Sequence, residues 1–222
     1  ECGLPRERTY VTGSPMAEVL HKNLAEIQAS DVHERLGLKK GHYILLSAHR
    51  EENIDTEKNF LCLFNAINAM AEKYDMPILY SCHPRSRHRL EATGFKLDPR
   101  VQVQQPLGFH DYNCLQMNAF AVVSDSGTLP EESSFFTSVG HPFPAVCIRT
   151  STESLDKAGF ILSGIDTKGL LQSVDTAVEL VKNGDYGTPV PDYTDENVST
   201  KVVKIIQSYV GVVNKMVWRK EL

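Results

Sequence analysis

The most informative stretch of this 222-residue chain reads Val123-Ser124-Asp125-Ser126-Gly127-Thr128-Leu129-Pro130-Glu131-Glu132. Its apolar start is typical of a buried strand, and Pro130 suits the first turn of a helix. The small residues between them would let backbone N–H groups approach an anion at the positive end of that helix. Ser126 and Thr128 add hydroxyl donors, while Glu131 and Glu132 would repel a close phosphate and suit sugar hydroxyls further out. Taken alone, the stretch favours a simpler interpretation, a helix whose acidic first turn complements its dipole.

Short apolar runs alternate with amphipathic stretches along the middle of the chain. Strands are expected at 43–47, 78–81, 101–105, 119–124, 145–149 and 160–162. Helices are expected at 60–71 with Asp55 as N-cap, and at 86–93, 111–118, 130–138 and 167–182. This alternation predicts a parallel sheet with right-handed crossovers. The predicted fold class is therefore α/β, a doubly wound, Rossmann-like domain from about residue 38 to about residue 182.

The two ends of the chain differ from the middle. Residues 9–12 carry one strand signal, a helix is expected from Pro15, and residues 183–197 are rich in Gly, Pro and Asp and predict a connecting loop. Residues 202–218 predict a long helix. Its apolar stripe consists of Val203, Ile206, Val210, Val213 and Val217. Such a stripe needs a partner: this domain, another chain, or a second domain outside the sequence.

Composition narrows the classes of function. The hydrophobic content of 41% and the charged content of 23% are ordinary for a soluble globular protein. The balance of 23 Lys and Arg against 28 Asp and Glu argues against a broad nucleic-acid-binding face, but it leaves room for a small anion pocket. No long apolar run or signal segment is present, so we expect a cytoplasmic protein without a membrane span. The five scattered cysteines are typical of reduced thiols.

Polar loops follow the predicted strands, at the edge where open parallel sheets bind ligands. His49 and Arg50 follow the first strand and can offer several donors to a phosphate, although a solvated loop neutralised by neighbouring glutamates fits equally well. His83 opens a basic segment that is most simply a solvated helix face, with no spacing typical of zinc. Phe109 could cover a base, but an N-terminal hydrophobic staple is the better interpretation. Arg149 begins another donor-rich loop. Together these loops favour a nucleotide diphosphate.

Read in order, these motifs resemble the non-hydrolysing UDP-N-acetylglucosamine 2-epimerase family. The resemblance rests on Ser47-Ala48-His49-Arg50-Glu51-Glu52-Asn53, on Ser124-Asp125-Ser126-Gly127 through Glu131-Glu132, on Arg149-Thr150-Ser151-Thr152-Glu153, and on Tyr10-Val11-Thr12-Gly13. Thr128-Leu129-Pro130, in place of the family's Gly-Ile-Gln, resembles the branch that makes UDP-N-acetyl-L-fucosamine from UDP-2-acetamido-2,6-dideoxy-L-talose for capsule or O-antigen polysaccharide. A second departure is Ser154-Leu155-Asp156 after Glu153, where the family continues Arg-Pro-Glu-Ala.

The family fold has two Rossmann-like domains that face each other across a cleft, as in GT-B glycosyltransferases. The resemblance implies that this chain is the C-terminal half. Residues 1–14 would lead in from a missing N-terminal domain and include its last strand at 9–12. Residues 15–198 would form the UDP-binding domain, and residues 199–222 would pack back on the missing domain. A homodimer without cofactor or metal is implied.

The resemblance also implies roles for particular residues. His49 and Ser126 would hold the diphosphate, and Gly127 and Thr128 would supply helix-start amides. Glu132 would accept from the ribose hydroxyls, Phe109 would lie near the uracil, and Arg50, His83 and Arg149 would complete the UDP and sugar contacts.

The implied reaction inverts C2 of a UDP-N-acetyl-sugar by eliminating UDP to a 2-acetamidoglycal and re-adding it, with the acid/base carboxylates in the missing half. A GT-B glycosyltransferase half and a non-enzymatic nucleotide-sugar-binding module are the alternatives, and trapping of the glycal discriminates among the three.

Overall fold

The computed structural model describes residues 3, 6, 9–82, 84–149 and 159–220. These residues form a six-stranded sheet in the order β3-β2-β1-β4-β5-β6, and every neighbouring pair of strands is parallel. The strands are β1 (Ile44–Ser47), β2 (Ile78–Ser81), β3 (Val101–Gln104), β4 (Ala121–Ser124), β5 (Ala145–Ile148) and β6 (Phe160–Ser163). The predicted α/β fold with a Rossmann-like parallel sheet is confirmed. The strand order reverses between β1 and β4, so the crevice expected to receive a ligand opens there.

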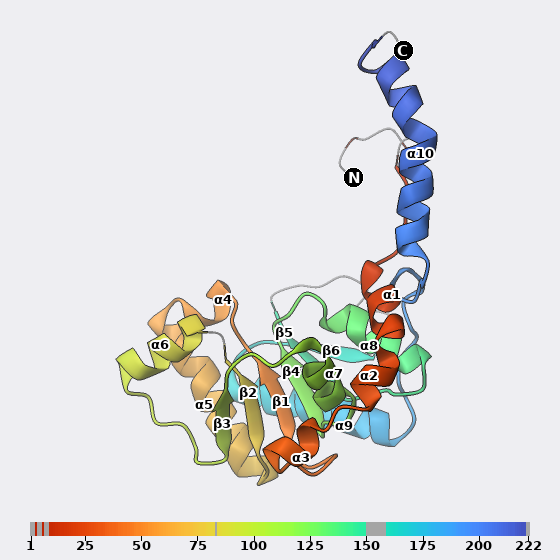
Figure 1. Cartoon of the computed structure of the whole chain (residues 1–222). Helices are drawn as coiled ribbons and strands as arrows, with labels where there is room; N and C mark the ends of the chain where they lie inside the picture. Colours follow the sequence, from red (N-terminus) through yellow and green to blue (C-terminus); the bar gives the residue numbers. More distant parts are fainter. Residues whose placement is uncertain (1–2, 4–5, 7–8, 83, 150–158, 221–222) are drawn as a thin grey trace.

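Helices cover both faces of the sheet (Figure 1). They are α1 (Pro15–Lys22), α2 (Leu24–Gln28), α3 (Val32–Leu36), α4 (Glu51–Ile54), α5 (Glu57–Tyr74), α6 (Pro84–Thr93), α7 (Phe109–Met117), α8 (Leu129–Ser138), α9 (Thr167–Lys182) and α10 (Val198–Met216), with a 3-10 turn at Pro191–Tyr193. Ile44 and Leu46 of β1 point into a core shared with α5 and α9, whereas Leu45 points into a second core shared with α1, α7 and α8. The central strands are therefore buried on both faces, as their continuous apolar character predicts.

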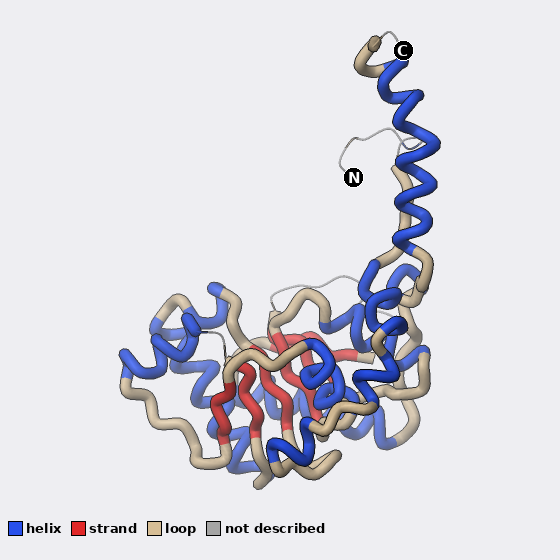
Figure 2. The backbone as a smooth tube through the Cα atoms, viewed as in Figure 1, coloured by secondary structure: helices blue, strands red, loops and turns tan. Residues whose placement is uncertain are grey.

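One local prediction is wrong, and the strand expected at 9–12 in a missing domain stays a prediction. Thr56, not Asp55, caps α5, because its hydroxyl accepts the Asn59 N–H at 3.1 Å, while Asp55 ends the short helix α4 inside the expected loop. Residues 9–12 form no strand and instead lie beside α10 (Figure 2). Tyr10 and Tyr209 are in hydroxyl contact, and the Lys201 ammonium donates to the Thr12 carbonyl at 3.3 Å. The β-rich composition of this segment cannot produce a strand without a neighbouring strand to pair with.

Helix α10 projects away from the sheet (Figure 1) and begins four residues before the predicted start at 202. Its apolar stripe is exposed, with Val203 at 57% and Ile206 at 53%. At its base, the Glu18 carboxylate accepts the Ser199 N–H at 2.8 Å and also contacts the Ser199 hydroxyl and Lys22. We call this set of contacts the Glu18 clamp. Within the described ranges, no helix has the combined length and apolarity needed to cross a bilayer.

Candidate functional site

The carboxyl ends of β1 and β4 lie next to each other and bring two polar loops together. Ser47 is the register partner of Ser124, and the Asp125 N–H donates to the Ser47 carbonyl at 3.1 Å. The residues that follow β1 and β4 must therefore meet above this edge of the sheet, in the crevice where the strand order reverses.

The turn from β4 into α8 is built from small hydroxyl residues. The Ser124 hydroxyl accepts the Ser126 N–H at 3.0 Å, and the Ser126 hydroxyl lies 2.9 Å from the Thr128 hydroxyl. Thr128 is the N-cap of α8, and Pro130 lies in the first turn as the sequence predicts. The positive end of the α8 dipole consequently opens at the carboxyl edge of the sheet, surrounded by hydroxyl groups.

Two guanidinium groups converge on this turn. A Cβ placed on Gly127 would lie 3.6 Å from Arg50 Nη2 and 3.7 Å from Arg149 Nη1. Arg50 comes from the loop after β1, where its Nε donates to the Asp125 carbonyl at 2.7 Å, and Arg149 comes directly after β5. Two arginines and a helix N-terminus that face one point make a strong site for a phosphate or carboxylate group.

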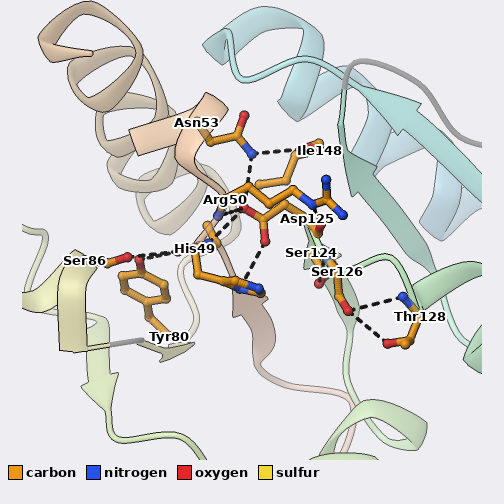
Figure 3. Close-up of polar contacts among 11 residues, drawn as sticks. His49, Arg50, Asn53, Tyr80, Ser86, Ser124, Asp125, Ser126, Thr128 and Ile148 are labelled. Carbon is orange, nitrogen blue, oxygen red and sulfur yellow. Dashed lines mark hydrogen bonds and ion pairs between the residues drawn. The ribbon is translucent and has the colours of Figure 1, made fainter. Parts of the chain in front are cut away.

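A buried carboxylate fixes the loop that carries His49 and Arg50. Asp125 is fully buried, and its Oδ2 accepts the backbone N–H groups of His49 and Arg50, each at 2.8 Å. Asn53 Nδ2 donates to the same oxygen at 3.1 Å and to the Ile148 carbonyl at 3.0 Å (Figure 3). The β1 loop is thereby tied to β4 and to β5. Sequence reasoning missed both Asp125 and Asn53, although an acidic residue directly after a buried strand was a usable signal.

The His49 side chain is 44% exposed and lies against the same carboxylate, with Nδ1 at 3.2 Å from Asp125 Oδ1 (Figure 3). The Ala48 carbonyl behind it accepts a hydrogen bond from the Tyr80 hydroxyl at 2.8 Å and a longer one from the Ser86 hydroxyl. Buried contacts therefore hold the backbone around His49, and its ring lies half-exposed at the carboxyl edge of the sheet.

Glu132 lies beneath the same turn and is almost completely buried, with 8% of its surface exposed. Thr128 Oγ1 and Gln116 Nε2 each donate to one of its carboxylate oxygens at 2.7 Å. Burial is the main cause that raises the pKa of Glu132, and these two donors oppose the rise. Sequence reasoning also missed Gln116, because nothing in the spacing of α7 singles it out. Glu131, one residue earlier, instead accepts a hydrogen bond from the Ser14 hydroxyl.

Phe109 is not the hydrophobic staple of α7, so that expectation is wrong. It is the first residue of the helix and is 40% exposed, with its ring edge-on to His110. The staple positions belong to Leu107 and Tyr112, which both pack against the core on that side of the sheet. The exposed Phe109 ring is left at the carboxyl edge of the sheet, after β3.

The predicted site residues therefore divide into groups. One group surrounds the β4–α8 turn, and it consists of His49, Arg50, Ser126, Gly127, Thr128 and Arg149. Glu132 lies under this turn, and Phe109 lies one loop away. His83 falls outside the described residues. The described part of the chain contains no group of three or more side chains that could hold a metal ion.

Comparison with known proteins assigns this arrangement to a family. The sequence model of UDP-N-acetylglucosamine 2-epimerase matches residues 1–207. A structure of UDP-N-acetylglucosamine 2-epimerase from Rickettsia bellii is 35% identical, with a TM-score of 0.85, and the match covers 98% of this chain and 58% of that one. The UDP-N-acetylglucosamine 2-epimerase of Methanococcus maripaludis is 26% identical over 214 residues, 90% of this chain and 56% of its own length.

A more distant structure supports the fold alone. The enzyme of Methanocaldococcus jannaschii, described in complex with UDP-GlcNAc and UDP, is 23% identical with a TM-score of 0.79, over 93% of this chain and 56% of that one. The chain spans about half the length of the curated relatives that it matches. The match along most of the chain, together with the parallel sheet and its strand-end loops, shows that the chain belongs to the UDP-N-acetylglucosamine 2-epimerase family.

Proposed function

We propose that the chain is the UDP-binding half of a UDP-N-acetyl-sugar 2-epimerase, with the diphosphate held at the β4–α8 turn. The observation that carries this proposal is the convergence of Arg50 and Arg149 on Gly127 at the positive end of α8. A diphosphate matches this arrangement better than a single carboxylate, because it spreads its charge over several acceptor oxygens that two guanidinium groups and a helix N-terminus can share.

The family resemblance supplies the other contacts of this proposal. Ser126 and His49 border the turn and would donate to the phosphates, and the amides of Gly127 and Thr128 open the helix. Each oxygen of Glu132 accepts one hydrogen bond and retains capacity for another, so a ribose hydroxyl could share it with Thr128. The exposed Phe109 ring would lie against the uracil, and His83 and Arg149 would complete the sugar side.

The proposed chemistry is the removal of the C2 proton and of UDP across C1–C2, followed by their return with inverted configuration at C2. The half described by this structure would stabilise the charge that develops on UDP as its bond to C1 breaks. The acid/base carboxylates would come from an N-terminal domain. That domain would pack on residues 9–12 and on the exposed stripe of α10, which covers 198–216. The complete enzyme would be a cytoplasmic homodimer, as the family resemblance implies.

We further propose that the sugar belongs to the branch that forms UDP-N-acetyl-L-fucosamine from UDP-2-acetamido-2,6-dideoxy-L-talose, in capsule or O-antigen synthesis. Thr128, the first residue of the Thr128-Leu129-Pro130 signature, links Ser126 to Glu132 through its hydroxyl group. A glycine at that position, as in the common family motif, would lack this link. The complete enzyme should therefore epimerise the deoxytalose substrate faster than UDP-N-acetylglucosamine and release a trappable glycal, whereas a glycosyltransferase would release none.

The first test is calorimetric titration of this chain with UDP and with uridine. UDP should bind more tightly than uridine, and Ser126→Ala should weaken UDP binding by about 1 kcal/mol while leaving uridine binding nearly unchanged. Ser138→Ala is the matched control, because it makes the same change at the opposite end of α8, where Ser138 donates to the Phe135 carbonyl. Equal affinity for UDP and uridine, or equal effects of the two serine variants, would contradict the diphosphate site.

A further inference from the structure

We propose that Asp125 is a positioning residue that holds the proton of the His49 imidazole on Nδ1 and thereby presents Nε2 to the anion at the start of α8. The identity of that anion rests on the proposed UDP site. The position of the proton does not, because it follows from the contacts of a fully buried carboxylate.

The two oxygens of Asp125 have different surroundings. Oδ2 receives three N–H groups, from the backbones of His49 and Arg50 and from the Asn53 amide, at 2.8, 2.8 and 3.1 Å. Only an acceptor can occupy that position. Oδ1 is buried without a hydrogen-bond partner among the described residues, and the nearest candidate donor is His49 Nδ1 at 3.2 Å. Because a buried carboxylate oxygen needs a donor, the nitrogen opposite Oδ1 should carry the proton.

The same contacts fix where the ring can lie. One oxygen of Asp125 accepts the backbone N–H of His49, and the other lies 3.2 Å from Nδ1 of its ring, so both parts of the residue lie against one buried carboxylate (Figure 3). The ring is about half exposed, on the side of the crevice that Ser126 borders (Figure 3). With Nδ1 directed inward, the outward nitrogen is Nε2.

This arrangement gives Nε2 a defined chemical role. In the neutral ring Nε2 is an acceptor, and in the imidazolium it donates to a phosphate oxygen while the buried carboxylate stabilises the positive charge. A donor placed there would strengthen its hydrogen bond as negative charge develops on the departing diphosphate. The proton stays shared between His49 and the phosphate and returns when UDP adds again, so none is consumed.

The geometry predicts what an amide at position 125 would do. In Asp125→Asn, the three N–H donors require the amide oxygen at the Oδ2 position, so the NH₂ group must take the Oδ1 position. That group is a donor, and Nδ1 must then accept, which moves the ring proton to Nε2. The substitution keeps the shape of the loop and reverses the tautomer.

Nitrogen-15 NMR of the imidazole rings measures this directly, with the His49 signals identified by their loss in His49→Gln. We expect the proton on Nδ1 in the unsubstituted chain and on Nε2 in Asp125→Asn. Asn53→Ala is the matched control, because it removes a donor from Oδ2 and leaves the Oδ1 face untouched, so the tautomer should not change. A proton on Nε2 in the unsubstituted chain would overturn the proposal, even if Asp125→Asn fails to fold. The same tautomer in both folded proteins would also overturn it.

Addition of UDP separates this inference from the proposed function. The Nε2 signal of His49 should shift on saturation with UDP, while Nδ1 keeps its proton. If UDP binds in calorimetry but the Nε2 signal does not change, the claim that Nε2 faces the anion is wrong, while the proposed UDP site is still supported. Absence of UDP binding with the proton on Nδ1 would contradict the proposed function and support the positioning by Asp125.

Discussion

Glu132 is a buried carboxylate that costs the folded protein stability. Its carboxylate is buried, and burial raises its pKa, so the ionised form is disfavoured in the folded protein. The amide oxygen of its partner Gln116 is buried without a hydrogen-bond partner among the described residues. A buried charge beside an unsatisfied amide oxygen is costly to the fold, and this cost is consistent with the proposed role of Glu132 in binding the ribose.

Replacement of Glu132 by Gln should therefore stabilise the protein and weaken UDP binding. The Gln116 amide can turn so that its oxygen accepts from the new NH₂ group. A raised pKa means that the folded state loses stability as pH rises through the carboxyl range, so the gain should be present at pH 8 and absent well below pH 4. At pH 8 we expect the free energy of unfolding to rise by about 1 kcal/mol, which is roughly 2–4 °C in Tm. We expect UDP binding to weaken by about 1–3 kcal/mol. Melting curves at both pH values and calorimetry measure these effects, and a gain that persists in acid would contradict the role of ionisation.

Sequence analysis identified the strand-end side chains that could donate to a ligand, and it missed those whose role depends on contacts inside the protein. His49, Arg50 and Arg149 follow β1 and β5, so knowledge of the strands alone places them at the binding edge of the sheet. Asp125 contacts Asn53, which lies 72 residues away in the sequence, and Gln116 contacts Glu132, which lies 16 residues away. Only the register of β1 against β4 and the packing of α7 on α8 bring those contacts about.

Helices and strands were predictable where a periodic apolar pattern ran long enough. The helix expected at 167–182 matches α9, because Leu170, Val174 and Ala177 recur on one buried face. The two five-residue helices α2 and α3 were not predicted, since such short segments carry little periodicity. The cap of α5 was misplaced by one residue because Asp55 and Thr56 are both good cap residues, and only the backbone geometry selects Thr56.

The start of β6 depends on one close backbone approach. A Cβ added to Gly159 would lie 2.2 Å from the Tyr186 carbonyl oxygen, which is far inside van der Waals contact. Gly159→Ala should therefore lower the free energy of unfolding by about 1–3 kcal/mol, measured by urea denaturation. Gly211→Ala in α10 is the matched control, because nothing lies within 4 Å of its Cβ position, and alanine should favour that helix by roughly 0.5–1 kcal/mol. Unchanged stability of Gly159→Ala would show that the segment around Tyr186 yields without cost.

The apolar stripe of α10 should govern the association state of this 222-residue chain in solution. Ile206 and Val213 are 53% and 36% exposed, and Tyr10 and Met216 border a cavity of about 230 Å³ on the same helix. Without a covering domain, this surface favours self-association. Light scattering during gel filtration should show a mass that grows with concentration, and Ile206→Glu with Val213→Lys should keep the chain monomeric. Gln207→Glu with Ser208→Lys is the charge-matched control, and equal behaviour of the two double variants would contradict the role of the stripe.

The fold class of the whole chain was predictable from the sequence, but the partner of its last helix was not. Alternating strands and helices with right-handed crossovers lead to few arrangements of a parallel sheet, and the observed order is one of them. The sequence also predicted that the apolar stripe from Val203 to Val217 needs a partner, and the structure leaves that stripe exposed. The chemical identity of that partner does not follow from the stripe, because an exposed apolar face fits any apolar surface of matching shape.

The Glu18 clamp has a mechanical consequence. It fixes the base of α10 beside the point where residues 9–12 leave the domain, since a Cβ on Gly13 would lie 2.7 Å from Asp195 Oδ2 and the Ser14 N–H donates to the Asp192 carbonyl. Residues 9–12 and α10 thus leave the domain at one point, where Gly13 has a φ of 84° that favours glycine. The 19 residues of α10 extend about 28 Å from this point, so a rotation of the helix by about 10° at its base would move its far end by roughly 5 Å. Ser14 also donates to Glu131 in the first turn of α8, so the same point is in contact with the helix of the proposed UDP site.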